Sequence, residues 1–218
     1  MLKKNKWMLL ISSLLILLPM AVGLILWEQL PEQLPFHWNA AGEIDGWCNK
    51  TQGVFMMPGV LLAVHWVCVV VTGLDPKNKD KNEKAKALIL WLVPVLSLMV
   101  NGLVYASALD RDVNVQTLLP VFLGVVFVMI GNYLPKCSRN STIGLKLPWT
   151  LYSDENWNAT HRLAGKIWIP GGVAMAATVF LPGKLYFWVM LAIAAVMVFV
   201  PTGYSYWFYK THEADKEQ

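Results

Sequence analysis

Long apolar blocks alternate with short polar stretches along this chain. The first block runs from Trp7 to Trp27 without an acidic or basic residue, and a helix of that length crosses about 30 Å of hydrocarbon. It exceeds the apolar core of a signal peptide and has no clear small-residue cleavage pattern, so we expect it to stay in the protein. Because five similar blocks follow, the pattern predicts six transmembrane helices, over residues 7–27, 54–74, 87–108, 118–134, 165–181 and 185–204.

The composition is typical of a membrane protein. Hydrophobic residues make up 56% of the 218 and charged residues 15%, and the mean hydropathy is +0.46. A water-soluble domain of this length would hardly tolerate that balance. We therefore expect a single polytopic domain, an all-α bundle in contact with the lipid bilayer.

The distribution of positive charge predicts the orientation of this bundle. With six spans, all but three of the 18 basic residues fall on one side, and the exceptions are Lys50, Arg111 and Lys184. The positive-inside rule then places both termini in the cytoplasm, with an outer loop at residues 28–53 and a cytoplasmic loop at residues 135–164. The net charge of +4 belongs to a membrane-facing surface, and direct nucleic-acid binding is not expected.

The outer loop combines turn residues with aromatic side chains. Residues 30–50 read LPEQLPFHWNAAGEIDGWCNK. Prolines stiffen the entry, and Asn39, Gly42 and Asp45 favour turns, so the pattern predicts an Ω-loop or a short hairpin. We expect a small apolar cluster inside it, formed by Phe36, Trp38, Ile44 and Trp47.

The chain lacks the familiar signatures of metal, cofactor and catalytic sites. His37, Glu43 and Asp45 could ligate a metal, but their spacing matches no recognised site, so a rigid surface loop is the favoured interpretation. There is no CxxC pair, phosphate-binding glycine loop or nucleophile elbow. We therefore predict no metal, no cofactor and no catalytic residue.

The cytoplasmic loop is too strongly patterned to be a simple linker. Residues 131–168 read GNYLPKCSRNSTIGLKLPWTLYSDENWNATHRLAGKIW. Asn140 and Gly144 suit a turn, and Ser153 is a candidate N-cap for a short helix that continues into the membrane. Trp157 and His161 share one face of that helix. An amphipathic helix at the membrane surface is the alternative interpretation of this face.

Two polar side chains fall inside predicted spans. His65 lies in the middle of the second span and Asn101 in the middle of the third. Polar groups at that depth are costly unless they are paired across helices, so a mutual hydrogen bond is one possibility. Interhelical bonding is the favoured interpretation over a proton relay or a ligand contact.

The two loop patterns resemble those of the SdpI family of bacterial toxin-immunity and signalling proteins. The pattern LPxxLPxHWNxxGxxDGWxxK is similar to the domain of unknown function at the N-terminus of that family, and GNYLPKxxxNxxIGLKLPWTLxxxxxWxxTHRLAGxxW resembles the family signature. The resemblance implies the signature positions Asn140, Gly144, Lys146, Pro148, Trp149, Trp157, His161 and Arg162. Lys146 departs from the arginine expected in many relatives, so a bidentate anion contact there is in doubt.

The resemblance also implies a function in the bacterial cell membrane. Such a protein protects its bacterium from a secreted toxic peptide, and it senses the peptide and holds a soluble transcriptional repressor at the membrane. The expected contacts to the peptide are Phe36, His37, Trp38, Asn39, Gly42, Asp45 and Trp47. A small transporter of a peptide or lipid-like substrate is the alternative, favoured by a proline in every span and by His65 and Asn101. A membrane enzyme using His161 is the third class.

Overall fold

The protein folds into long helices with one β-hairpin and one folded connecting segment. The computed structural model describes residues 5–78, 83–111 and 113–212. Six of its helices are long and apolar enough to cross a membrane, and the all-α membrane fold is confirmed. The chain divides into two compact units. The first contains residues 1–74 and 86–115, and the second contains residues 75–85 and 116–218.

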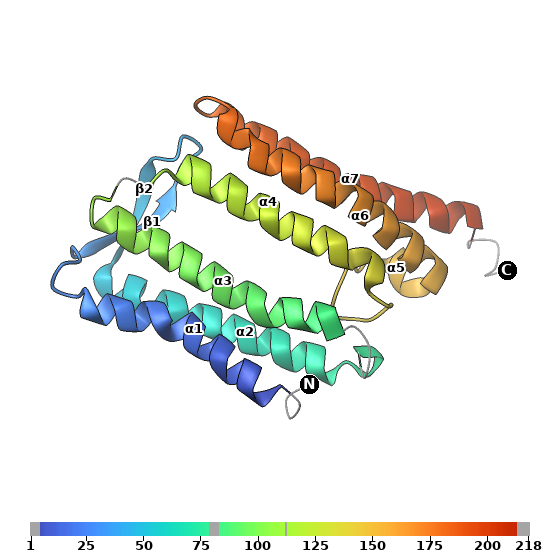
Figure 1. The fold of residues 1–218 in the computed structure, drawn as a ribbon. Helices are drawn as coiled ribbons and strands as arrows, with labels where there is room; N and C mark the ends of the chain where they lie inside the picture. The colour runs from blue at the N-terminus through green and yellow to red at the C-terminus, as the bar shows by residue number, and fades with distance from the viewer. Residues whose placement is uncertain (1–4, 79–82, 112, 213–218) are drawn as a thin grey trace. The chain divides into compact units, whose positions relative to one another are not determined.

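The first unit contains three long helices and the hairpin (Figure 1). Its helices are α1 (Lys6–Ile25), α2 (Met57–Leu74) and most of α3 (Glu83–Ala108). A π-helical turn, η1 (Gln52–Met56), leads into α2, and a short 3-10 turn, η2 (Pro76–Asn78), follows it.

The hairpin connects α1 to η1 and confirms the loop structure expected from the turn residues (Figure 1). Strands β1 (Gln33–Trp38) and β2 (Ile44–Asn49) pair antiparallel, with Leu34 opposite Cys48 and Trp38 opposite Ile44. Lys50 fastens the base of the hairpin, because its Nζ donates to the Trp27 carbonyl at 3.2 Å and lies 2.9 Å from Glu32 Oε1. The hairpin is therefore held against the end of α1.

Interhelical hydrogen bonds connect α3 to α1 inside the first unit. Ser97 Oγ donates to the Ile16 carbonyl at 3.0 Å, and Tyr105 Oη donates to the Pro19 carbonyl at 3.0 Å. Pro19 lies within α1, and such a residue cannot continue the helical hydrogen-bond ladder. Apolar packing beneath the hairpin completes this core, with Leu30, Leu34, Val54, Val104 and Tyr105 buried together.

The second unit contains α4 (Val115–Tyr133), α6 (Asp154–Ala177) and α7 (Leu185–His212). Short helices join them: η3 (Leu134–Lys136) and α5 (Pro148–Tyr152) precede α6, and η4 (Thr178–Phe180) precedes α7. Glycines let α4 and α6 approach closely, since a Cβ on Gly124 would lie 2.5 Å from the Gly172 carbonyl oxygen. Small residues serve the same purpose in many membrane helix pairs.

Two helices extend beyond the stretches that hydropathy marks. The helix α6 begins at Asp154, well before residue 165, because its first turns are polar and are defined by a cap instead of by apolar residues. The helix α7 continues past residue 204 to His212.

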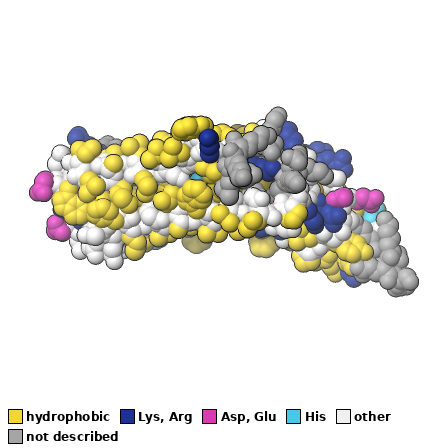
Figure 2. Space-filling model, turned by 90° about the horizontal axis from the view of Figure 1, so that it is seen from below, with side chains coloured by type: hydrophobic (Ala, Val, Ile, Leu, Met, Phe, Trp, Pro, Cys, Tyr) yellow, Lys and Arg dark blue, Asp and Glu magenta, His cyan; other side chains and the backbone are white. Residues whose placement is uncertain are grey.

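Apolar side chains cover the outer surfaces of the long helices. On the face drawn in Figure 2, hydrophobic side chains spread along the helices. Leu14, Val67 and Phe199 are among the exposed apolar residues of the protein. A soluble protein rarely exposes so much contiguous apolar surface. Lipid is the environment that such helices require.

Candidate functional site

The segment between η3 and α6, residues 137–153, folds around the side chain of Asn140. The Oδ1 atom of this buried residue accepts hydrogen bonds from the backbone N–H groups of Thr142 and Ile143, at 2.8 and 2.6 Å. Its Nδ2 donates to the carbonyls of Ser138 and Ile143, at 2.8 and 3.0 Å. One amide side chain therefore fixes this turn. We call residues 137–153, together with the first turns of α6, the motif segment.

Trp157 and His161 hold the other side of this turn. Their rings stack with centroids 4.0 Å apart. The Trp157 Nε1–H donates to the Cys137 carbonyl at 2.7 Å, and the Leu145 N–H donates to His161 Nε2 at 3.0 Å. Since His161 Nδ1 lies 2.8 Å from the Trp157 carbonyl, it is the nitrogen that carries the proton, and both ring nitrogens are occupied.

Gly144 is the position where the loop passes over these two rings. Its φ is +116°, and a Cβ placed there would lie 2.5 Å from His161 Nε2 and 3.0 Å from the Trp157 ring. Both the backbone conformation and the close approach require glycine. The four signature residues Asn140, Gly144, Trp157 and His161 therefore form one interlocked group.

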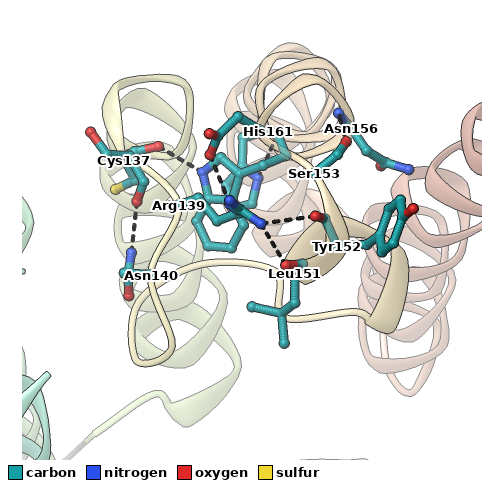
Figure 3. Close-up of polar contacts among 11 residues, drawn as sticks. Cys137, Arg139, Asn140, Leu151, Tyr152, Ser153, Asn156 and His161 are labelled. Atoms are coloured by element: carbon teal, nitrogen blue, oxygen red, sulfur yellow. Dashed lines mark hydrogen bonds and ion pairs between the residues drawn. The ribbon is translucent and has the colours of Figure 1, made fainter. Parts of the chain in front are cut away.

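Arg139 clamps the start of α6 to α5 (Figure 3). Its Nε donates to Asp154 Oδ1 at 2.7 Å, and its Nη1 donates to the carbonyls of Leu151 and Tyr152 at 2.8 and 2.9 Å. Ser153 caps α6, because its Oγ accepts from the Asn156 N–H at 3.0 Å, as predicted from the sequence. The guanidinium thus donates to two carbonyls at the C-terminal end of a short helix, where backbone acceptors have no partner within the helix itself.

Buried polar contacts connect the motif segment to its neighbours within the second unit. Asn156 Nδ2 donates to the Ser205 carbonyl at 3.0 Å, and Ser205 Oγ donates to Asn156 Oδ1 at 2.8 Å. Asp75 Oδ2 accepts from the Ser141 N–H at 2.8 Å. Arg139, Asn156 and Asp75 were not predicted, because their partners are far away in sequence or are backbone atoms, and neither leaves a spacing pattern.

The hairpin presents a different kind of surface. Phe36 and Trp47 are 53% and 56% exposed, whereas Trp38 packs against the core that contains Leu30 and Leu34. The predicted cluster of Phe36, Trp38, Ile44 and Trp47 is therefore wrong. In β2 alternate residues face opposite sides, so Trp47 points away from the side of Ile44 and Cys48. In β1 an irregularity of the strand register between Pro35 and Trp38 breaks the alternation, so Phe36 and Trp38 differ in exposure.

Polar contacts stiffen the hairpin turn. Asn39 Oδ1 accepts from the N–H groups of Ala41 and Glu43, at 2.8 and 3.1 Å, and Gly42 has a φ of +77°. His37 Nδ1 lies 2.6 Å from Asp45 Oδ1, so these two predicted residues contact each other. The described residues contain no group of three His, Cys, Asp or Glu side chains that could hold a metal.

An open cavity of about 410 Å³ lies beside the hairpin turn in the first unit. Trp38 and Gly42 line it together with Glu43 and Ile44, and the end of α3 and the residues after it supply the rest of the wall: Ser107, Asp110, Arg111, Val113 and Val115. The wall carries both acidic and basic side chains, which suits a polar or dipolar ligand group.

Two regions of the chain match known family models. Residues 136–205 match the SdpI/YfhL protein family, and residues 14–62 match a domain of unknown function, DUF1648. The chain is 26% identical over 209 residues to the Immunity protein SdpI of Bacillus subtilis (strain 168), which covers 95% of this chain and 97% of that protein. Both comparisons relate the chain to the SdpI family. No solved structure matches it significantly.

The similarity to the SdpI family and the six apolar helices make this a multi-pass bacterial membrane protein. The SdpI match begins at Lys136, immediately before the motif segment, and extends through α6 into α7. The DUF1648 match covers most of α1, the hairpin and the start of α2. Each matched region therefore contains one of the two structured connections.

The remaining signature residues of the SdpI segment lie at its surface. Lys146, Pro148 and Arg162 are exposed, and Trp149 is half-buried, with its ring 4.9 Å from that of Tyr206. The signature residues thus form two groups: the interlocked group defined above and an accessible group at the surface.

Cys137, whose carbonyl accepts the Trp157 N–H, is buried. Burial raises the pKa of its thiol.

The polar residues inside the spans do not bond to each other. His65 Nε2 pairs with Ser12 Oγ of α1 at 3.0 Å, and Asn101 Nδ2 donates to the Ser97 carbonyl of its own helix at 2.8 Å. The possible bond between His65 and Asn101 is therefore absent, although His65 does connect two helices. His65 has its hydrogen-bond partner in α1, and Asn101 has its partner in its own helix, α3.

Proposed function

We propose that this protein protects its bacterium from a secreted antimicrobial peptide toxin. The observation that carries the proposal is the match along 95% of the chain to an immunity protein of Bacillus subtilis. The match includes both structured connections, so it extends beyond the apolar helices that any membrane protein could share. The bilayer and the secreted peptide are the partners that this function requires.

The hairpin is the part that we assign to the peptide. The charge distribution supports an orientation with both termini in the cytoplasm, which exposes the hairpin on the outer face. Phe36 and Trp47 offer two large exposed rings on the strands of a hairpin whose turn is held by Asn39 and whose base is anchored by Lys50. Rigid aromatic side chains bind peptides at low cost in conformational entropy.

A survival assay tests this assignment. The protein and a Phe36→Ala/Trp47→Ala variant are expressed at equal levels in a B. subtilis strain that lacks its own SdpI, and the cells are exposed to culture supernatant of the parent strain. We expect survival to fall at least about ten-fold in the variant, because two exposed rings carry contact energy of that order. Trp188→Ala is the control, since this equally exposed tryptophan lies on α7. Equal survival of the hairpin variant and the wild type would remove the hairpin from the mechanism.

We assign the second role, sensing the peptide and sequestering a soluble repressor, to the motif segment. Its interlocked group supports a rigid shape, and Arg162 remains exposed for a soluble partner. No catalytic step is part of the proposal. His161 would have to release the Leu145 N–H or the Trp157 carbonyl before it could act as an acid or base.

Transport of a peptide or lipid-like substrate is the second candidate. The observation that favours it is the presence of buried polar atoms without a hydrogen-bond partner among the described residues: Ser13 Oγ, His65 Nδ1 and Asn101 Oδ1. Such atoms are costly in a membrane interior and often mark substrate or proton pathways. Substrate-dependent flux in proteoliposomes would favour this candidate over a binding protein.

A further inference from the structure

The end of α7 is longer and more aromatic than a simple span requires. With 28 residues, α7 is about 42 Å long at 1.5 Å per residue, whereas the hydrocarbon layer is about 30 Å thick. The aromatic residues gather near its C-terminal end, where Tyr206 and Trp207 are 45% and 53% exposed. This end of α7 therefore has the length to reach the polar headgroup region.

The short helix α5 packs against this same part of α7 within the second unit. The Trp149 ring lies 4.9 Å from the Tyr206 ring, and the Tyr152 ring meets the Tyr209 ring edge-on at 5.9 Å. We call these four rings the aromatic platform. The exposed Trp207 directly follows Tyr206 in the chain. Trp and Tyr side chains prefer the boundary between hydrocarbon and headgroups, because one part of each ring system is apolar and another is polar.

Two exposed lysines flank the aromatic platform. Lys146 lies just before α5, and Lys210 Nζ lies 6.0 Å from the centre of the Tyr206 ring. Among the described residues neither lysine has an ion-pair partner, and the neighbouring carboxylate of Asp154 is bound by Arg139. The platform therefore carries positive charge that nothing in the described part of the chain neutralises.

We propose that α5 and the end of α7 form a binding surface for anionic phospholipids. The rings of the aromatic platform lie at the level of the glycerol backbone, and Lys146 and Lys210 bind phosphodiester oxygens of the headgroup. Lysine serves as a point charge for such an anion, so a bidentate arginine is not required. This surface is independent of the hairpin and of the peptide that the hairpin is proposed to bind.

Lipid titration of the purified full-length protein tests the proposal. Detergent-solubilised wild type, Lys146→Gln/Lys210→Gln and Lys184→Gln are titrated with phosphatidylglycerol or with phosphatidylcholine, and native mass spectrometry counts the lipids retained. We expect the wild type to prefer phosphatidylglycerol and the double variant to bind it about ten-fold more weakly. Lys184 is the matched control, because it is exposed and precedes α7 at the opposite end of that helix.

The neutral lipid and the control variant show whether the two lysines act specifically. The proposal predicts that phosphatidylcholine retention is the same in the three proteins and that Lys184→Gln keeps the preference of the wild type. It is overturned if the wild type shows no preference, or if Lys184→Gln loses as much as the double variant. Unchanged phosphatidylglycerol binding by the double variant would also overturn it and would leave the surface to an acidic protein partner.

Discussion

The signature residues of the motif segment mainly stabilise the fold of that segment. Asn140, Trp157 and His161 place their polar atoms on backbone groups of the same segment. The sequence predicted the turn at Asn140 and Gly144 and the shared face of Trp157 and His161, because these depend on local spacing. It could not predict that the Trp157 N–H meets the Cys137 carbonyl, since a backbone acceptor has no residue-type signal.

Gly144 gives a direct residue-scale prediction. In Gly144→Ala the new methyl group must displace His161, and the residue keeps a φ of +116°, so we expect a loss of about 1–3 kcal/mol in stability. Gly183→Ala is the control, because Gly183 has a φ of +54° but open space around it. Thermal unfolding in detergent measures both. Equal melting temperatures for the two variants would contradict the close packing of Gly144 on the rings.

At the scale of elements, sequence reasoning located the hairpin and the start of α6 from turn and cap residues. The sequence-based predictions were wrong for features that depend on how the elements pack in three dimensions. The Trp47 ring is exposed because β2 alternates, and the Phe36 ring is exposed because the register of β1 is irregular between Pro35 and Trp38. His65 pairs with Ser12 because α1 passes beside it. Hydropathy also missed the polar first turns of α6, which Ser153 and Arg139 organise.

Arg139 is the residue on which the junction of α5 and α6 depends. Arg139→Gln removes its bonds to Asp154 and to the Leu151 and Tyr152 carbonyls, so we expect a loss of about 1–3 kcal/mol in stability. Limited proteolysis near α5 should become faster at the same time. Arg162→Gln, at an exposed position of the same segment, should leave both properties unchanged. If Arg139→Lys behaves as the wild type, the fork geometry of the guanidinium is not what holds the junction.

At the scale of the whole molecule, the proposed function depends on how the chain crosses the membrane. Three of the six candidate spans lie between the hairpin and the motif segment: Gln52–Leu74, Lys86–Ala108 and Val115–Lys136. If all three cross the membrane, the odd number of crossings puts the hairpin and the motif segment on opposite faces, and the bias in basic residues favours the outside for the hairpin in the proposed topology. The peptide contact and the repressor contact need this separation.

Labelling of single cysteines in intact cells tests that separation most directly. Glu43→Cys in the hairpin turn and Ser141→Cys in the motif segment are introduced at exposed positions after Cys48, Cys68 and Cys137 are replaced by serine. The proposed topology predicts that a membrane-impermeant maleimide labels Glu43→Cys in intact cells and labels Ser141→Cys only after lysis. Labelling of both positions from the outside would contradict it.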